Sequence, residues 1–297
     1  MEKIKRTIGF IFTHPIGKKH PIKSLYRFIL WQLQCNLSPD KFIVKDYIHG
    51  IKFYARKGLT GITGNIYSGL HEFNDMGFLL HFLRPNDTFF DIGANVGSFT
   101  LLASGVCRAK SIAIEPVPST FNVLSKNIEL NSLHEKVYLI NSGAGGKQGK
   151  LTFSSNQDTT NHVTTEDEKK KLDTIEVSMI TIDSLLIDSQ PNLIKIDVEG
   201  FETEVLNGMG DTLSGPSLKA IIIELNGSGE RYGFNENNIH ELLLANDFKP
   251  YTYDPFSRLL LVEEKFNDFN TIYCRDVNFV NNRIKSALEI KVMGEII

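Results

Sequence analysis

Short apolar runs alternate with segments of helical periodicity through the middle of the chain. Between the runs, apolar residues recur at helical spacing, as Phe121, Leu124 and Ile128 do after Pro118. Runs this short and this apolar are typical of strands buried on both faces. The predicted strands lie at residues 88–92, 111–115, 137–142, 193–198 and 219–225. Strands that alternate with helices imply right-handed crossovers, so we predict an α/β domain with a mostly parallel sheet flanked by helices.

Both ends of this predicted domain carry further elements. Residues 1–35 show a helical pattern, and residues 41–55 predict a β-hairpin that turns at His49 and Gly50. The apolar face predicted for the helix consists of Ile22, Leu25, Phe28, Ile29 and Leu33. The late segments YTYD and NTIYCRD predict an antiparallel edge, whereas residues 143–175 form a polar insertion without strong periodicity. We therefore divide the chain into an N-terminal extension at 1–60, a main domain at 61–280 and a C-terminal tail at 281–297.

Cysteine content and charge narrow the class of protein. The 3 cysteines are scattered, which argues against a disulfide framework or a thiolate zinc site, and no apolar run approaches the length of a membrane span. We therefore expect a soluble, cytoplasmic protein. Residues 1–60 hold 12 Lys/Arg against 3 Asp/Glu, while the rest of the chain holds 20 against 32. An acidic body disfavours a nucleic-acid partner.

The basic N-terminal segment leaves two interpretations open. Residues 1–35 could form a membrane-surface helix, with Trp31 as an interfacial anchor, which would make the protein peripheral to a membrane. Alternatively, this helix is docked on its own domain.

The end of the first predicted strand, DIGANVG, has the features of a nucleotide site. Gly93 permits a tight turn, Gly97 allows close packing of the next helix, and Glu115 at the end of the second strand can accept hydrogen bonds from a ribose. The spacing is GxxxG instead of the dinucleotide pattern GxGxxG, and Asp91 would repel a pyrophosphate. The sulfonium and ammonium groups of S-adenosylmethionine tolerate an acidic pocket. A turn that holds no ligand is the alternative.

Four segments carry a resemblance to a known family. DTFFDIGANVGSFTLLAS, AIEP, LIKIDVEGFETEVLNGM and IIIELN resemble the FkbM family of S-adenosylmethionine-dependent methyltransferases, over roughly residues 60–275. The resemblance implies a class I methyltransferase (Rossmann-like) fold and O-methylation of a sugar or polyketide hydroxyl. It implies cofactor contacts from Asp91, Gly93, Asn95, Gly97 and Glu115, and pocket positions for Asp197 and Glu199. We add to the expected cofactor site Glu72, Pro116 and Ser142.

The acceptor side is expected around the motif IDVEGFE. Methyl transfer requires a positioned hydroxyl and a base that removes its proton. Asp197 and Glu199 would point the same way if the strand were extended, and Lys195 on the same face could pair with a carboxylate. Together with Glu202 these carboxylates could orient the acceptor and act as the base, or bind a divalent metal. Helix capping by Glu199 and Glu202 is the structural alternative.

Other polar residues could complete the acceptor site. His162 in the polar insertion is a candidate general base, because its unperturbed pKa lies near neutrality, and the base is left open between it and the carboxylates around Asp197. Asn161, Glu224 and Asn226 are expected to contact the acceptor.

The predicted function is S-adenosylmethionine-dependent O-methyl transfer to a sugar or glycoconjugate. Base-amine methyltransferases use an Asn/Asp-Pro-Pro-aromatic turn after the fourth strand, where this sequence has Asp-Val-Glu-Gly, which suits a hydroxyl-rich acceptor better than a nucleobase. A non-catalytic relative that binds cofactor or glycan, and a nicotinamide-dependent oxidoreductase, are the alternatives.

Overall fold

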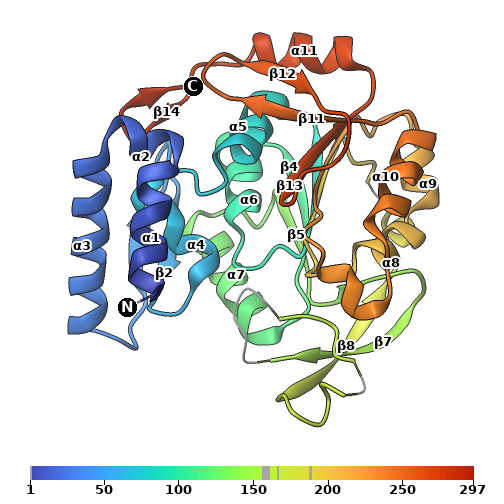
Figure 1. Cartoon of the computed structure of the whole chain (residues 1–297), viewed down its shortest axis with the longest axis horizontal. Helices are drawn as coiled ribbons and strands as arrows, with labels where there is room; N and C mark the ends of the chain where they lie inside the picture. Colours follow the sequence, from blue (N-terminus) through green and yellow to red (C-terminus); the bar gives the residue numbers. More distant parts are fainter. Residues whose placement is uncertain (1, 156–160, 166, 187–188) are drawn as a thin grey trace.

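A large twisted sheet forms the centre of the molecule (Figure 1). The computed structural model describes all residues except 1, 156–160, 166 and 187–188. Over the described residues the sheet has eight strands in the order β12-β11-β13-β10-β9-β3-β4-β5. Their bounds are β3 Thr88–Ile92, β4 Lys110–Ile114, β5 Val137–Ile140, β9 Leu193–Ile196, β10 Ala220–Glu224, β11 Lys249–Asp254, β12 Leu259–Val262 and β13 Asn270–Cys274.

The direction of the strands agrees with the sequence prediction. Strands β5, β4, β3, β9 and β10 pair in parallel, whereas β13, β11 and β12 form an antiparallel edge. The order reverses between β3 and β9, and ligands of open α/β sheets bind at such a point, outside the carboxyl ends of the strands. The expected class I methyltransferase architecture is confirmed.

Helices cover both faces of the sheet because alternate strand residues point to opposite sides. Phe89 and Leu193 belong to one buried apolar cluster, and their neighbours Phe90 and Ile194 belong to the other. The first cluster includes residues of α5 Phe73–Phe82, α7 Pro118–Leu130, α11 Val277–Lys285 and the π-helix η1 Leu101–Val106, which follows the short α6 Ser98–Thr100. The second includes residues of α8 Glu202–Asn207, α9 Gly210–Ser214, α10 Glu236–Ala245 and the 3-10 helix η3 Ile182–Leu185; a further 3-10 turn, η4, spans Ser228–Tyr232.

The N-terminal extension differs from the single helix predicted for residues 1–35. It forms α1 Glu2–Thr13, α2 Pro15–Lys19 and α3 Pro21–Leu37, because Pro15 and Pro21 each begin a new helix and the side chain of His14 caps α2 by accepting a hydrogen bond from the amide of Ile16. The predicted hairpin is present as β1 Ile43–Asp46 and β2 Lys52–Ala55, followed by α4 Thr60–Ser68.

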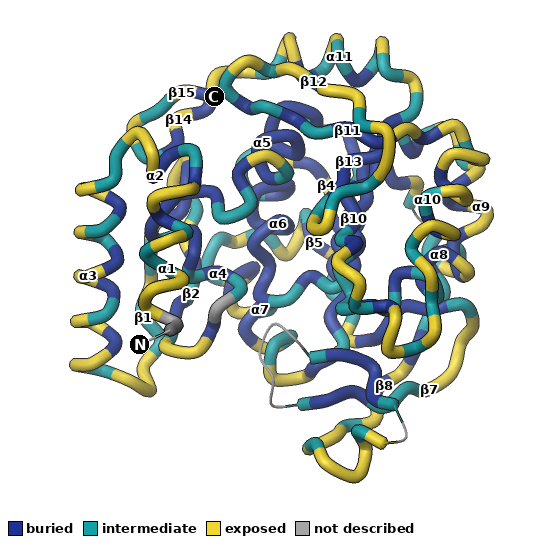
Figure 2. The backbone as a smooth tube through the Cα atoms, viewed as in Figure 1, coloured by how far each residue is buried: buried dark blue, intermediate teal, exposed yellow. Residues whose placement is uncertain are grey.

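The apolar face predicted for α3 is largely wrong. Its buried residues are Ser24, Phe28, Trp31 and Cys35, and Phe28 packs edge-on against Tyr67 of α4. Trp31 is only 3% exposed, so it is not an interfacial anchor. Ile22, Ile29 and Leu33 are exposed. Figure 2 shows exposed positions along α3. The sequence alone did not identify which of two apolar faces would meet α4.

Two other segments depart from their predictions. The polar insertion and the residues directly after it form a three-stranded sheet of β6 Gly143–Ala144, β8 Thr174–Ile180 and β7 Gly149–Ser154, which lies at the lower edge of Figure 1. The predicted boundary at residue 280 falls inside α11. The remaining tail forms the hairpin β14 Lys291–Val292 and β15 Glu295–Ile296, in which Glu295 bonds to Lys19 at 2.7 Å and His20 at 2.8 Å. None of the described helices is both long and apolar enough to cross a membrane.

Candidate active site

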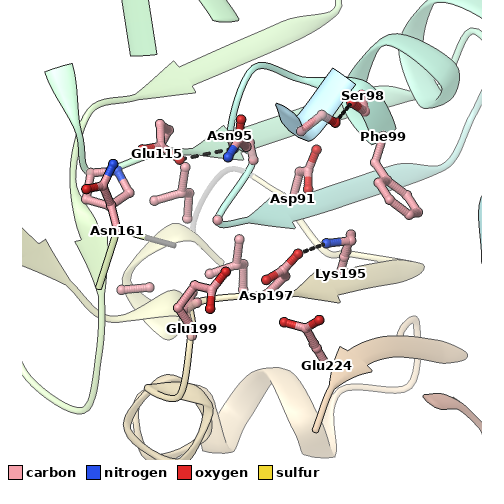
Figure 3. A pocket seen from close by; sticks show the side chains of 18 of the residues that line it. Asp91, Asn95, Ser98, Phe99, Glu115, Asn161, Lys195, Asp197, Glu199 and Glu224 are labelled. Carbon is pink, nitrogen blue, oxygen red and sulfur yellow. Dashed lines mark hydrogen bonds and ion pairs between the residues drawn. The ribbon is translucent and has the colours of Figure 1, made fainter. Parts of the chain in front are cut away.

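A cavity of about 350 Å³ lies at the carboxyl ends of β3, β4, β9 and β10. Figure 3 shows Asp91, Glu115, Asp197 and Glu224 around it, each at or just after the end of a different strand. The volume is within the usual range for small-molecule sites. The position of the cavity agrees with the site predicted from the strand-end motifs.

The loop after β3 is shaped by backbone conformations that favour glycine. Gly93 has φ +81°, and a Cβ placed there would lie 1.8 Å from the carbonyl oxygen of Asp197. The amides of Gly93 and Ala94 donate to the carbonyl of Ile114, at 3.0 and 2.9 Å. This close approach of the β3 loop to the β4 and β9 ends forms the floor of the cavity. Only glycine fits at position 93.

Gly97 has the packing role anticipated for it but does not line the cavity. Its φ is +92°, and a Cβ there would lie 2.6 Å from Leu124 Cδ1 of α7. The expectation that Gly97 contacts the cofactor is therefore not supported, whereas the neighbouring Asn95, with φ +50°, does line the cavity.

Glu115 at the end of β4 is the residue expected to hold a ribose. Its Oε2 accepts a hydrogen bond from the amide of Asn95 at 3.0 Å, and its Oε1 accepts one from the amide of Val117 at 2.9 Å. Each carboxylate oxygen has a second lone pair, so each can also accept a hydrogen bond from a hydroxyl. Burial raises the pKa of Glu115 to about 7 despite these two bonds.

Asp91 has a structural role beside its place in the cavity. Its Oδ2 accepts two hydrogen bonds from Thr100, from the amide at 3.0 Å and from the hydroxyl at 2.5 Å. These bonds hold the start of the π-helix against β3, and burial raises the pKa of Asp91 to about 6. Irregular helical turns of this type are frequent at functional sites.

Lys195 supplies a buried positive charge to the acidic site. Its Nζ lies 2.6 Å from Asp197 Oδ2 and 4.8 Å from the centroid of the Phe99 ring. Burial opposes the charge, but Asp197, Glu72 and Asp91 raise the pKa of Lys195 above its ordinary value. The predicted pair of Lys195 with a carboxylate is present.

Three carboxylates converge beside this pair. Asp197, Glu199 and Glu224 each offer an oxygen, and these atoms all lie within 4.8 Å of one another. Burial and the neighbouring Asp197 raise the pKa of Glu199 to about 7 and that of Glu224 to about 9. A divalent cation or retained protons would both relieve this repulsion.

The backbone that carries Glu199 is not the extended strand supposed from the sequence. Strand β9 ends at Ile196, and Glu199 and Gly200 have φ +56° and +100°. Glu202 fixes this turn, because its Oε1 accepts from the amides of Val198 and Gly200 at 3.1 and 3.2 Å. Asp197 and Glu199 still line the same cavity.

A second cavity, of about 820 Å³, adjoins the first. The two share His71, Glu72, Asp197 and Glu224. Carboxylates, amides and aromatic rings form the rest of its wall, namely Phe10, Asn74, Asp75, Tyr251, Thr252, Tyr253, Asn267, Asp268, Phe269 and Asn270. Asn270 Nδ2 donates to Glu72 Oε2 at 2.5 Å and to Asp75 Oδ2 at 3.2 Å.

The remaining predicted residues divide into two groups. Glu72, Pro116, Ser142 and Asn161 line the first cavity. The residues absent from the lining of both cavities are His162, Glu202 and Asn226.

Each residue outside the cavities has a local structural reason for its position. His162 is 5% exposed, and its Nε2 lies 3.2 Å from Glu168 Oε1 within the insertion. Glu202 holds the β9 turn, and the exposed Asn226 accepts from the amide of Ser228. The general-base role proposed for His162 therefore finds no support in this geometry.

Sequence reasoning missed part of the cavity wall. Arg6 of α1, Gly61 of α4, and His71 in the loop before α5 line the first cavity together with Phe99 and Phe201. Arg6 carries no local motif, and helix α1 brings it to the site from far along the chain, whereas His71 directly precedes Glu72 in the sequence. Phe201 lies inside the IDVEGFE motif and could have been named from it.

The class of protein follows from this fold and this strand-end site, which are those of a methyltransferase. The sequence model of the methyltransferase FkbM domain matches residues 91–250, more than half of the chain. The chain belongs to the FkbM methyltransferase family, as the four segments predicted.

Curated relatives are similar to part of the chain. Over 153 residues the chain is 29% identical to the hexuronic acid methyltransferase AglP of Haloferax volcanii, covering 50% of this chain and 59% of the relative. It is 28% identical to Methyltransferase 1 of Beauveria bassiana over 151 residues, covering 43% and 60%. The chain thus spans about three fifths of the length of these relatives.

A solved structure of M. jannaschii TYW2 in complex with AdoMet is also similar. It is 13% identical, with 79% of this chain and 86% of that chain covered and a TM-score of 0.41. A likeness at this level supports no inference about cofactor or substrate.

The expected methyl donor, S-adenosylmethionine, fits both the family and the residues of the first cavity. A buried carboxylate with spare acceptor capacity stands at the end of β4, and the opposite wall is rich in carboxylates that suit a sulfonium and an ammonium group. Membership of a methyltransferase family speaks against the nicotinamide-dependent alternative.

Proposed function

We propose that this protein is an S-adenosylmethionine-dependent O-methyltransferase whose acceptor is a hydroxyl of a sugar or glycoconjugate. The observation that carries the proposal is the second cavity, which shares Asp197 and Glu224 with the first cavity, called the cofactor cavity from here on. Its carboxylates and amides can accept and donate hydrogen bonds to several hydroxyls, and its tyrosine rings offer apolar surface. This combination suits a polyol better than a flat base.

The residues shared by both cavities have distinct roles in this proposal. Bound S-adenosylmethionine supplies an activated methyl group. Asp197 accepts the proton of the acceptor hydroxyl, and Lys195 holds Asp197 in position at 2.6 Å. Glu224, with a pKa raised to about 9 by burial and by Asp197, keeps its proton near neutral pH and can donate a hydrogen bond.

The charge of the second cavity favours a neutral or amino sugar as the acceptor. Its described lining contains Glu72, Asp75, Asp197 and Asp268 beside the protonated Glu224, and no Lys or Arg. A carboxylate about 4 Å from another costs roughly 4 kcal/mol at the effective dielectric constant of a protein surface. We therefore infer that a uronate is disfavoured here, in contrast to the hexuronic acid named for the Haloferax volcanii relative.

The role of Asp197 is tested by Asp197→Asn, with the exposed Asp211→Asn of α9 as the matched control. We expect Asp197→Asn to lower kcat by about 100- to 10,000-fold, because the proton acceptor is lost. The variant should still bind S-adenosylmethionine in calorimetry, with a loss of affinity far smaller than the loss of kcat. Asp211→Asn should behave as the unchanged protein. Full turnover by Asp197→Asn would contradict the assignment of the base.

Acceptor charge is tested by comparing matched glycosides, uronides and amino-sugar glycosides, with release of S-adenosylhomocysteine as the readout. We expect kcat/KM for the neutral or amino acceptors to exceed that for the uronide by at least about 10-fold. A preference for the uronide would refute the charge argument. Binding of cofactor without turnover on any hydroxylated acceptor would favour the non-catalytic alternative.

A further inference from the structure

The outward face of helix α3 is apolar along its whole length. Ile22, Leu33 and Leu37 are 83%, 53% and 84% exposed. The complete set of large apolar side chains exposed on this helix is Ile22, Tyr26, Ile29, Leu30, Leu33 and Leu37. At 3.6 residues per turn their spacing places them in a single stripe about 100° wide.

The packing of the fold does not explain this stripe. The buried residues of the helix lie on the opposite side, where Phe28 meets Tyr67 of α4 and Trp31 is 3% exposed. Helix α3 thus has two apolar faces, of which the domain covers one. Figures 1 and 2 show α3 at the edge of the molecule, with exposed residues along its outer side.

One exposed basic side chain borders the stripe, and two further basic residues lie close to it in the sequence. Lys23 lies next to it on the helix surface, Arg27 lies half-buried one turn further along, and the exposed Lys18 precedes the helix. Residues 1–60 as a whole hold 12 Lys/Arg against 3 Asp/Glu. An exposed apolar stripe with a cationic border is the pattern of helices that lie in the interface of an anionic bilayer.

We propose that helix α3 docks the protein on an anionic lipid surface, with its apolar stripe inserted among the acyl chains. A second copy of the chain is the competing occupant. An isologous dimer through this face would bring the same basic residues of two copies together, whereas anionic headgroups neutralise them. The charge of the surface therefore favours lipid.

Docking in this orientation would have a consequence for the candidate active site. The inner side of α3 contributes Phe28, Trp31 and Cys35 to a third cavity of about 760 Å³, which shares Arg6 and His71 with the cofactor cavity. The cofactor cavity would then face the lipid side of the molecule, behind α3 and the residues Arg6 of α1 and Gly61 of α4 that line it. This consequence rests on the proposed function, whereas docking does not.

The test is co-sedimentation of the full chain with vesicles of phosphatidylcholine, alone or with about one third phosphatidylglycerol. We expect binding to the anionic vesicles that weakens as salt is raised, and little binding to the neutral ones. The variant Ile29→Gln/Leu33→Gln should lower the partition coefficient by about 10-fold or more, because two apolar side chains lose their burial in lipid. Gln favours helices, so α3 is retained.

A matched control and a second readout make the test specific. Leu242→Gln/Leu244→Gln makes the same change at two exposed positions of α10 and should bind vesicles as the unchanged chain does. Trp31 is the only tryptophan, and it lies within one helix diameter, about 10–12 Å, of the stripe. Vesicles that contain brominated lipid should therefore quench its fluorescence.

Several outcomes would overturn the proposal. These are no binding of the unchanged chain to anionic vesicles, equal binding by the α3 variant, and binding without quenching of Trp31. A dimer in light scattering that the α3 variant converts to a monomer, without lipid binding, would assign the face to a second copy. Activity on a soluble acceptor is unaffected in every case, so failure here is distinguishable from failure of the proposed function.

Discussion

At the scale of single residues, Glu115 illustrates how one side chain serves both the fold and the site. Its two oxygens accept hydrogen bonds from the backbone amides of Asn95 and Val117, and these bonds fix the loops after β3 and β4. The same carboxylate lines the cofactor cavity. Its position could be predicted because it ends an apolar strand. The position of Arg6 could not, because only the packing of helix α1 brings it there.

Replacing Glu115 by Ala should weaken the binding of S-adenosylmethionine by roughly 30- to 150-fold, equivalent to about 2–3 kcal/mol for the lost charge-assisted hydrogen bonds. Isothermal titration calorimetry measures this, with the surface variant Glu129→Ala as the control. Circular dichroism should show that the variant is folded at the temperature of the titration. Unchanged affinity in a folded variant would remove the ribose from this position.

At the scale of elements, the close approach of the loop after β3 to the end of β9 depends on the glycine at position 93. Any other residue at position 93 would place a Cβ 1.8 Å from the backbone oxygen of Asp197 and would have to adopt φ +81°. The tight turn was predicted from the sequence. Its contact partner was not, since Asp197 lies far along the chain.

Gly93→Ala should lower the free energy of unfolding by about 3 kcal/mol or more, from the left-handed backbone and the overlap together. Chemical denaturation measures the change. Gly210→Ala is the control, because a Cβ there meets nothing within 4 Å, and it should be neutral or stabilising by about 0.4–1 kcal/mol. Equal stability of the two variants would show that the turn can adapt.

Elements with strong patterns were predictable and weakly patterned ones were not. The parallel strands are apolar throughout, so β3, β4, β9 and β10 were placed within one or two residues. Strands β7 and β8 expose residues on one face and bury only a small apolar cluster on the other. The two strands pair although they lie far apart in the sequence. The polar composition of the insertion concealed them.

At the scale of the whole molecule, buried acidic groups dominate the dependence of stability on pH. Burial raises the pKa of Glu224 to about 9 and that of Glu115 and Glu199 to about 7, from an ordinary value of 4.5. The folded chain therefore retains protons that the unfolded chain releases above pH 4.5, and stability falls as pH rises towards 9. His14 and His81, lowered to about 4 by burial, act in the opposite direction below pH 6.5.

The melting temperature should consequently fall from pH 6.5 to pH 9, the window between the ordinary pKa of His and the raised pKa of Glu224. Differential scanning fluorimetry across this range measures it. Glu224→Gln should flatten the curve, because its proton no longer has to be lost. The exposed Glu129→Gln should not. A melting temperature that rises over this window would contradict the buried-carboxyl account.

The overall arrangement was predictable only in part. The basic N-terminal segment was visible from charge, but its division at Pro15 and Pro21 and the contact of Glu295 with Lys19 and His20 were not. Both ends of the chain thus pack beside the main domain. Such contacts depend on side chains that meet across nearly the full length of the sequence.

The central claim is that the cavity at the ends of β3, β4, β9 and β10 is a methyl-donor site. Calorimetric titration with S-adenosylmethionine, with NADH as the control ligand, tests it most directly. We predict micromolar affinity for S-adenosylmethionine and no binding of NADH. Binding of NADH alone, or of neither ligand, would contradict the account.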